Sequence, residues 1–74
     1  MRLTAAIHQE DTGYVARCLE TGVASQGETF EEARQNLIEA VELHYRGEDL
    51  SDIEPSPALV PIEVNLPVPE RLAG

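Results

Sequence analysis

The chain has 74 residues with one cysteine, so it is a single small domain that cannot form an intrachain disulfide. Its formal net charge is -9, with 14 acidic residues against five arginines and no lysine. This balance argues against direct nucleic acid binding and favours a cationic protein partner. A second interpretation has equal weight: the charge serves only solubility, or it reflects a salt-adapted or arginine-rich proteome.

Neither a membrane-spanning segment nor a signal peptide is visible in the sequence. No run of about 18 apolar residues occurs, and residues 1–8 lack the apolar core and cleavage site of a signal peptide. We therefore expect a cytoplasmic protein with no membrane partner. The lone Cys18 suits a reducing compartment and is expected to pack as a small hydrophobic residue.

Residues 3–26 predict a meander of three antiparallel strands. Leu3, Ala5 and Ile7 alternate with polar or small residues, as in a strand with one buried face. Residues 14–19 return after a polar turn that contains Gly13. After a second turn, residues 23–26 form a short third strand.

The next segment carries a sharply marked helix start. Thr29 and Glu32 form a capping box: the Thr29 hydroxyl accepts from the Glu32 amide, and the Glu32 carboxylate reaches back to the Thr29 amide. The helix should run for about 17 residues and end near Gly47, which suits the left-handed conformation. Its apolar stripe comprises Phe30, Ala33, Leu37, Ala40, Val41 and His44, flanked by Ile38 and Tyr45.

The last third predicts a loop and a fourth strand. Residues 48–57 are acidic and contain two prolines, so we expect a loop, with Leu50 and Ile53 packed inward. In residues 60–66 apolar and other residues alternate, which predicts a strand. Pro61 cannot donate to a ladder, so this strand should lie at a sheet edge.

These elements together predict an α+β fold. A right-handed crossover through the helix makes the fourth strand parallel to the first. The strand order would then be 3-2-1-4, with the helix on one face. We expect residues 1–66 to form the domain and residues 67–74 a short C-terminal tail.

Four short motifs follow one another in the first two thirds of the chain. They are Gly-Tyr-Val-Ala at 13–16, Ser-Gln-Gly-Glu-Thr at 25–29, Glu-Glu-Ala at 31–33 and Asn-Leu-Ile-Glu-Ala at 36–40. In this order the motifs resemble the HicB antitoxin family. The resemblance implies a partial ribonuclease H-like fold of β-β-β-α-β order. It also implies an antitoxin that binds and blocks a small basic RNA-cleaving toxin of the HicA type.

The chain departs from that family at two places. Many members continue into a C-terminal DNA-binding domain, whereas this sequence ends soon after residue 66. We therefore expect protein binding by this chain, with DNA binding either absent or supplied by another chain. The family's second strand usually continues with Cys-Pro and a Pro-Gly turn, where this chain has Cys-Leu-Glu-Thr-Gly at residues 18–22. An orphan member, acting as a homo-oligomeric small-molecule-binding or regulatory module, is the alternative.

No catalytic, metal or cofactor site is expected. A ribonuclease H-like nuclease needs three or four carboxylates around Mg²⁺, and the predicted strand interiors offer only Glu63. His8 and His44 have no nucleophile placed beside them. We therefore predict a protein that is not an enzyme.

Two surfaces are candidates for partner binding. Acidic or polar residues recur at helical spacing on the polar side of the predicted helix, next to one apolar residue; they are Glu31, Gln35, Glu39, Glu42 and Leu43. An ordinary solvated helix face is the alternative interpretation. Unpaired strand edges compete as a contact surface, and a domain this small is expected to associate into a homodimer or a higher homo-oligomer.

Overall fold

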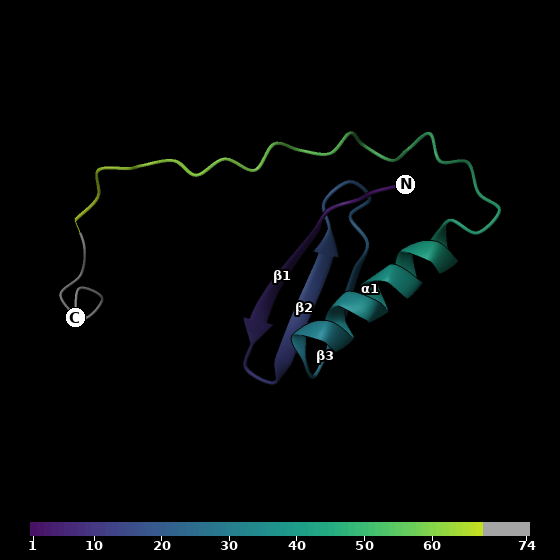
Figure 1. The fold of residues 1–74 in the computed structure, drawn as a ribbon, viewed down its shortest axis with the longest axis horizontal. Helices are drawn as coiled ribbons and strands as arrows, with labels where there is room; N and C mark the ends of the chain where they lie inside the picture. Colours follow the sequence, from purple (N-terminus) through teal and green to yellow (C-terminus); the bar gives the residue numbers. More distant parts are fainter. Residues whose placement is uncertain (68–74) are drawn as a thin grey trace.

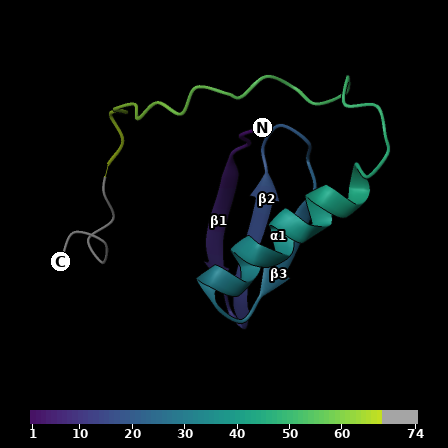
Figure 2. The ribbon, with the colours of Figure 1, turned by 45° about the vertical axis from the view of Figure 1, so that its right-hand side comes forward.

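Three strands and one helix form the folded part of this computed structural model, which describes residues 1–67. Strands β1 (Ala5–Glu10), β2 (Gly13–Cys18) and β3 (Ala24–Gly27) precede helix α1 (Phe30–His44). The helix crosses one face of the sheet, and the chain after it turns back past the end of the sheet before it extends away (Figures 1 and 2). Among the described residues, no helix is long and apolar enough to cross a membrane.

The predicted meander is confirmed. The sheet has the order β1-β2-β3, with both strand pairs antiparallel and β2 in the centre. The register pairs Ile7 with Ala16 and Ala16 with Ser25, which places side chains of one parity beneath α1. β1 begins at Ala5, two residues later than the sequence pattern predicts.

Of the two hydrogen bonds predicted for the capping box, the structure confirms the one to the Thr29 hydroxyl and corrects the one to the Glu32 carboxylate. The Glu32 amide donates to the Thr29 hydroxyl at 3.0 Å. The Glu32 carboxylate, however, accepts from the amide of Glu28 at 2.9 Å and not from that of Thr29. Thr29 is extended at the N-cap, with φ -126° and ψ 162°. Just before it, the backbone at Gly27 lies close to the first turn of α1. A Cβ on Gly27 would lie 2.5 Å from the Ala33 nitrogen, so only glycine fits there.

The core lies between α1 and β2. Among the described residues, four apolar side chains are buried, namely Ala16, Cys18, Ala33 and Leu37, and Leu3, Ile7, Tyr14, Val23 and Val41 pack around them. The predicted burial of Cys18 is thus confirmed. Phe30, which the helical pattern placed on the buried stripe, is half exposed and meets the Tyr14 ring edge-on at 6.2 Å. So small a core leaves little reserve of stability.

The predicted fourth strand is wrong. No strand follows α1 in the described residues, and positions 54–67 are all exposed along an extended path away from the sheet (Figure 1). The sheet therefore lacks the parallel partner of β1 that the order 3-2-1-4 and the β-β-β-α-β arrangement require. Of the predicted tail, only Pro67 is described, and residues 68–74 lie outside the described residues.

The alternation of backbone groups gives a physical reason for this error. The Thr4 carbonyl accepts from the Leu19 amide, so Thr4 points its backbone toward the β2 side. Ile7, which has the opposite parity and packs on the core, therefore points its backbone outward. If residues 60–66 ran parallel to β1 with Val60 and Ile62 facing α1, these residues would point their backbone groups away from β1. The residues between them, which include Pro61, would have to form the hydrogen bonds with β1. Proline has no amide to donate.

Candidate partner-binding site

The predicted partner-binding residues lie together on the outer side of α1. All five are exposed, and Leu43 has 67% of its surface open to solvent. At the helical rise of 1.5 Å per residue, the stripe from Glu31 to Glu42 is about 16 Å long. We call the set Glu31, Gln35, Glu39, Glu42 and Leu43 the acidic stripe. The structure thus brings the predicted residues to one surface of one helix.

The charge of the acidic stripe is only partly compensated. Arg34 donates to the Glu31 carboxylate at 2.9 Å, and both side chains are well exposed. An exposed pair of this kind contributes about 0–1 kcal/mol and is screened by salt. Within residues 1–67, Glu39 and Glu42 form no ion pair. The second half of the stripe therefore presents negative charge to an approaching cationic surface.

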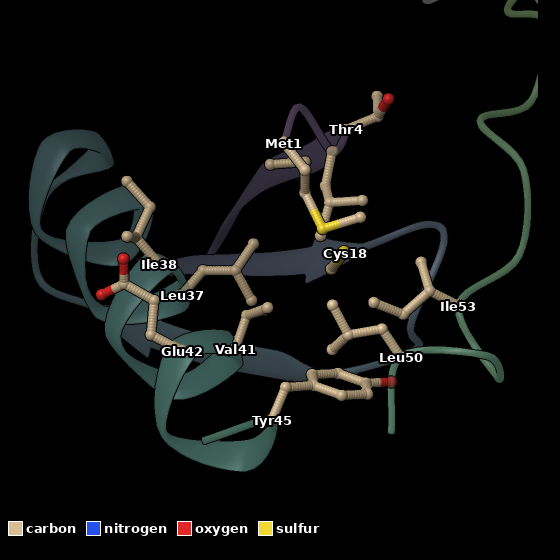
Figure 3. Close-up of a pocket in the computed structure, with 12 residues that line it drawn as sticks. Met1, Thr4, Cys18, Leu37, Ile38, Val41, Glu42, Tyr45, Leu50 and Ile53 are labelled. Carbon is tan, nitrogen blue, oxygen red and sulfur yellow. The ribbon is translucent and has the colours of Figure 1, made fainter. Parts of the chain in front are cut away.

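A second surface feature is an apolar groove that the sequence pattern alone does not reveal. It has a volume of about 360 Å³ and lies between the start of β1, the second half of α1 and the loop after it. Figure 3 shows Leu37, Val41, Tyr45, Leu50 and Ile53 around this space. The groove is lined by Met1, Leu3, Thr4, Ala5, Cys18, Leu37, Ile38, Val41, Glu42, Tyr45, Leu50 and Ile53. The expected inward packing of Leu50 and Ile53 was the only sequence signal for it.

Glu20, a buried carboxylate next to this groove, holds three chain segments together. Its side chain is only 2% exposed. Oε1 accepts from the Thr4 amide at 2.7 Å and lies 3.6 Å from Sγ of Cys18, and the Glu20 carbonyl accepts from the Glu54 amide at 3.0 Å. The Thr4 amide is the main reason why the pKa of Glu20 falls from 4.5 to about 2, although burial opposes this shift. Sequence reasoning placed Glu20 in an ordinary turn and missed this role.

Tyr45 closes the helix end of the groove. Burial raises the pKa of its hydroxyl above 10.0, and the nearby Asp52 carboxylate adds to the shift. The phenol therefore stays neutral and can donate a hydrogen bond over the whole physiological pH range. In the described part of the chain, this hydroxyl, Glu42 and Thr4 are the polar side-chain groups of a mostly apolar lining.

The positions of the histidine, cysteine and carboxylate side chains bear on metal binding. No group of three or more His, Cys, Asp or Glu residues within positions 1–67 is placed to hold a metal ion. His8 and His44 are exposed on separate elements, and Nε2 of His8 lies 3.7 Å from the Glu10 carboxylate.

Comparison with known protein families places the chain in a group defined by sequence. A family model described as a family of unknown function, DUF7387, matches residues 4–65. The chain belongs to the DUF7387 family. The match includes all three strands, α1 and most of the extended segment of this DUF7387 protein. No curated protein and no solved structure matches the chain. Any statement about the function of this DUF7387 protein therefore rests on its residues and their geometry.

Proposed function

We propose that this DUF7387 protein is a non-enzymatic, HicB-like antitoxin of the cytoplasm. Its partner would be a small basic RNA-cleaving toxin of the HicA type, which it binds and neutralises. The observation that carries the proposal is the exposed acidic stripe on α1, in a chain whose net charge is -9. The four HicB-like motifs support it further, because they lie in β2, at the β3–α1 junction and along α1 itself.

Electrostatics explains how such a surface would act. Glu39 and Glu42 lie one turn apart without ion-pair partners among the described residues. A basic toxin approaching this side of α1 meets their combined field within the Debye length of about 8 Å at physiological salt. Complementary charge speeds encounter and suppresses wrong partners more than it adds to affinity. Leu43, beside them, offers apolar area that a partner can cover.

The discriminating experiment uses the protein encoded by the reading frame next to this chain, which the proposal predicts to be small and basic. The two proteins are co-expressed, the complex is isolated on a sizing column, and growth is followed with and without the DUF7387 protein. We expect a complex and relief of toxicity. If neither is observed, the proposal is wrong.

Charge-neutral variants then locate the contact surface. The double variant Glu39→Gln/Glu42→Gln should slow association roughly tenfold at low salt and reduce its salt dependence. The matched control is Glu10→Gln/Asp11→Asn, which removes the same charge from the exposed β1–β2 turn. If both variants slow association equally, the net charge of the protein sets the association rate, and the acidic stripe is not a defined contact.

The apolar groove supports a second candidate function. Its volume of about 360 Å³ lies at the lower end of the range for small-molecule sites, roughly 300–1,000 Å³. The protein would then be an orphan, homo-oligomeric small-molecule-binding or regulatory module without a toxin partner. A panel of small apolar ligands should raise the melting temperature of the parent, and Val41→Asp should abolish that rise. Ligands that leave the melting temperature unchanged would exclude this function.

A further inference from the structure

An extended apolar segment stands exposed at the end of the described chain. Its apolar side chains Val60, Ile62, Val64 and Leu66 are 68%, 80%, 64% and 71% exposed. They share one parity, whereas Pro61, Glu63 and Asn65 have the other. In an extended strand, residues of one parity form one face. Residues 59–66, here called the C-terminal segment, are not a strand in the described chain. As a strand they would present these four side chains on one apolar face, which has nothing to cover in the described chain, with Leu59 on the other face.

The free edge of β1 offers a matching surface. Within residues 1–67, β1 pairs with β2 on one side and with no strand on the other. Because Thr4 points its backbone toward the β2 side, strand alternation makes Ala5, Ile7 and Gln9 present their amides and carbonyls outward. The apolar groove opens on the same side, since Leu3 and Ala5 line it at β1 and Ile38 lines it on α1.

The position of Pro61 selects the direction of pairing. If the apolar face of the C-terminal segment lies toward α1 and the segment runs antiparallel to β1, Val60, Ile62 and Val64 point their amides at β1. Pro61 then points away from β1, where its missing amide costs nothing. In a parallel arrangement Pro61 faces β1 and one ladder bond is lost.

The covering segment cannot easily come from the same chain. The Glu54 amide is bonded to the Glu20 carbonyl, and the Glu20 side chain is bonded to Thr4, so the chain leaves near the start of β1. An antiparallel strand must begin at the other end, beside Glu10, about 17 Å away. The six links from Glu54 to Val60 span at most roughly 21 Å. That length leaves too little chain to pass around the edge of β1 and reverse direction.

We propose that two copies of this protein exchange their C-terminal segments. The segment of each copy adds antiparallel to the free edge of β1 in the other copy and lays its apolar face over the groove. Each apolar side chain hides on the order of 100 Å² when buried. Four such side chains from each copy and the groove surface they cover amount to on the order of 1,600 Å², the size of a stable protein interface. This homodimer requires no toxin and does not depend on the function proposed above.

Proline substitution at adjacent positions tests the proposal in the full-length chain. Val64→Pro removes an amide that points at β1, whereas Glu63→Pro removes one that points away. We expect Val64→Pro to raise the dimer dissociation constant at least about tenfold and Glu63→Pro to change it little. Val64→Ala separates the loss of the apolar side chain from the loss of the amide. Light scattering on a sizing column gives the mass, and circular dichroism checks that the sheet and helix remain folded.

Isotope-filtered NMR on a mixture of labelled and unlabelled chains identifies which copy supplies the strand. We expect contacts between the C-terminal segment of one copy and β1 of the other, in antiparallel register. Three results would overturn the proposal. They are a monomeric parent, contacts only within one chain, and greater disruption by Glu63→Pro than by Val64→Pro.

Discussion

Leu37 is the position where one substitution tests the packing of α1 most directly. Its side chain is 4% exposed and lies in the core with Ala16, Cys18 and Ala33. Leu-to-Ala changes at buried sites cost about 2–5 kcal/mol, and the cost falls where the surroundings can fill the space. Leu37 also lines the apolar groove, whose open side lets neighbours or water move in. We therefore expect Leu37→Ala to reduce the free energy of unfolding by about 2–3 kcal/mol.

That loss is large for this protein. At about 0.05–0.15 kcal/mol per residue, a chain of this length is stable by roughly 4–11 kcal/mol. The melting temperature should fall by about 10–20 °C, since 1 kcal/mol shifts a domain of this size by about 4–8 °C. Urea unfolding followed by circular dichroism, at one fixed protein concentration, measures the change.

A matched control is available on the same helix. Leu43 is 67% exposed, so Leu43→Ala should change the free energy of unfolding by no more than about 0.5 kcal/mol. If the two alanine variants unfold at the same urea concentration, the assignment of the buried face of α1 is wrong.

Three further predictions concern the junctions around the core. Thr29→Ala should cost about 0.5–2 kcal/mol through the lost cap and Thr29→Ser much less; equal losses in urea unfolding would argue against the cap. Gly27→Ala should reduce the free energy of unfolding by about 1–3 kcal/mol because its Cβ would meet the Ala33 nitrogen at 2.5 Å. An unchanged melting temperature would contradict this close contact between Gly27 and Ala33. The folded state lowers the pKa of Glu20 from 4.5 to about 2; its stabilisation is therefore complete above pH 4.5 and disappears as the pH falls toward 2. Glu20→Gln should flatten this acid limb in unfolding measured against pH, and an unaltered limb would refute the role of the carboxylate.

The helix and the meander were predictable because their signals are local. The cap at Thr29, the helical spacing of Ala33 and Leu37, and the turn before Gly13 each act within a few residues. The acidic stripe followed from the same periodicity. Gly47 also takes the predicted left-handed conformation, with φ 71°. In these elements the local preferences and the fold agree.

The features that sequence reasoning missed depend on contacts between distant segments. Glu20 and Thr4 lie 16 residues apart, and no local pattern indicates that the carboxylate accepts from that amide. The groove forms only where β1, α1 and the following loop meet. The alternation in residues 60–66 predicted a fourth strand of the sheet, which is wrong for the described chain. Such a pattern does not say which strand edge, if any, a segment joins.

By itself, the sequence determined the type and approximate place of each regular element before residue 46, because capping, periodicity and turn chemistry are short-range effects. The limits came from the structure: β1 begins two residues later than predicted, and α1 has 15 residues instead of about 17. It also determined which helix face carries charge. Only the tertiary structure decided how the sheet ends. The free edge of β1, the buried carboxylate of Glu20 and the exposed C-terminal segment arise from backbone direction and from the length of chain between elements, neither of which appears in a pattern of residue types.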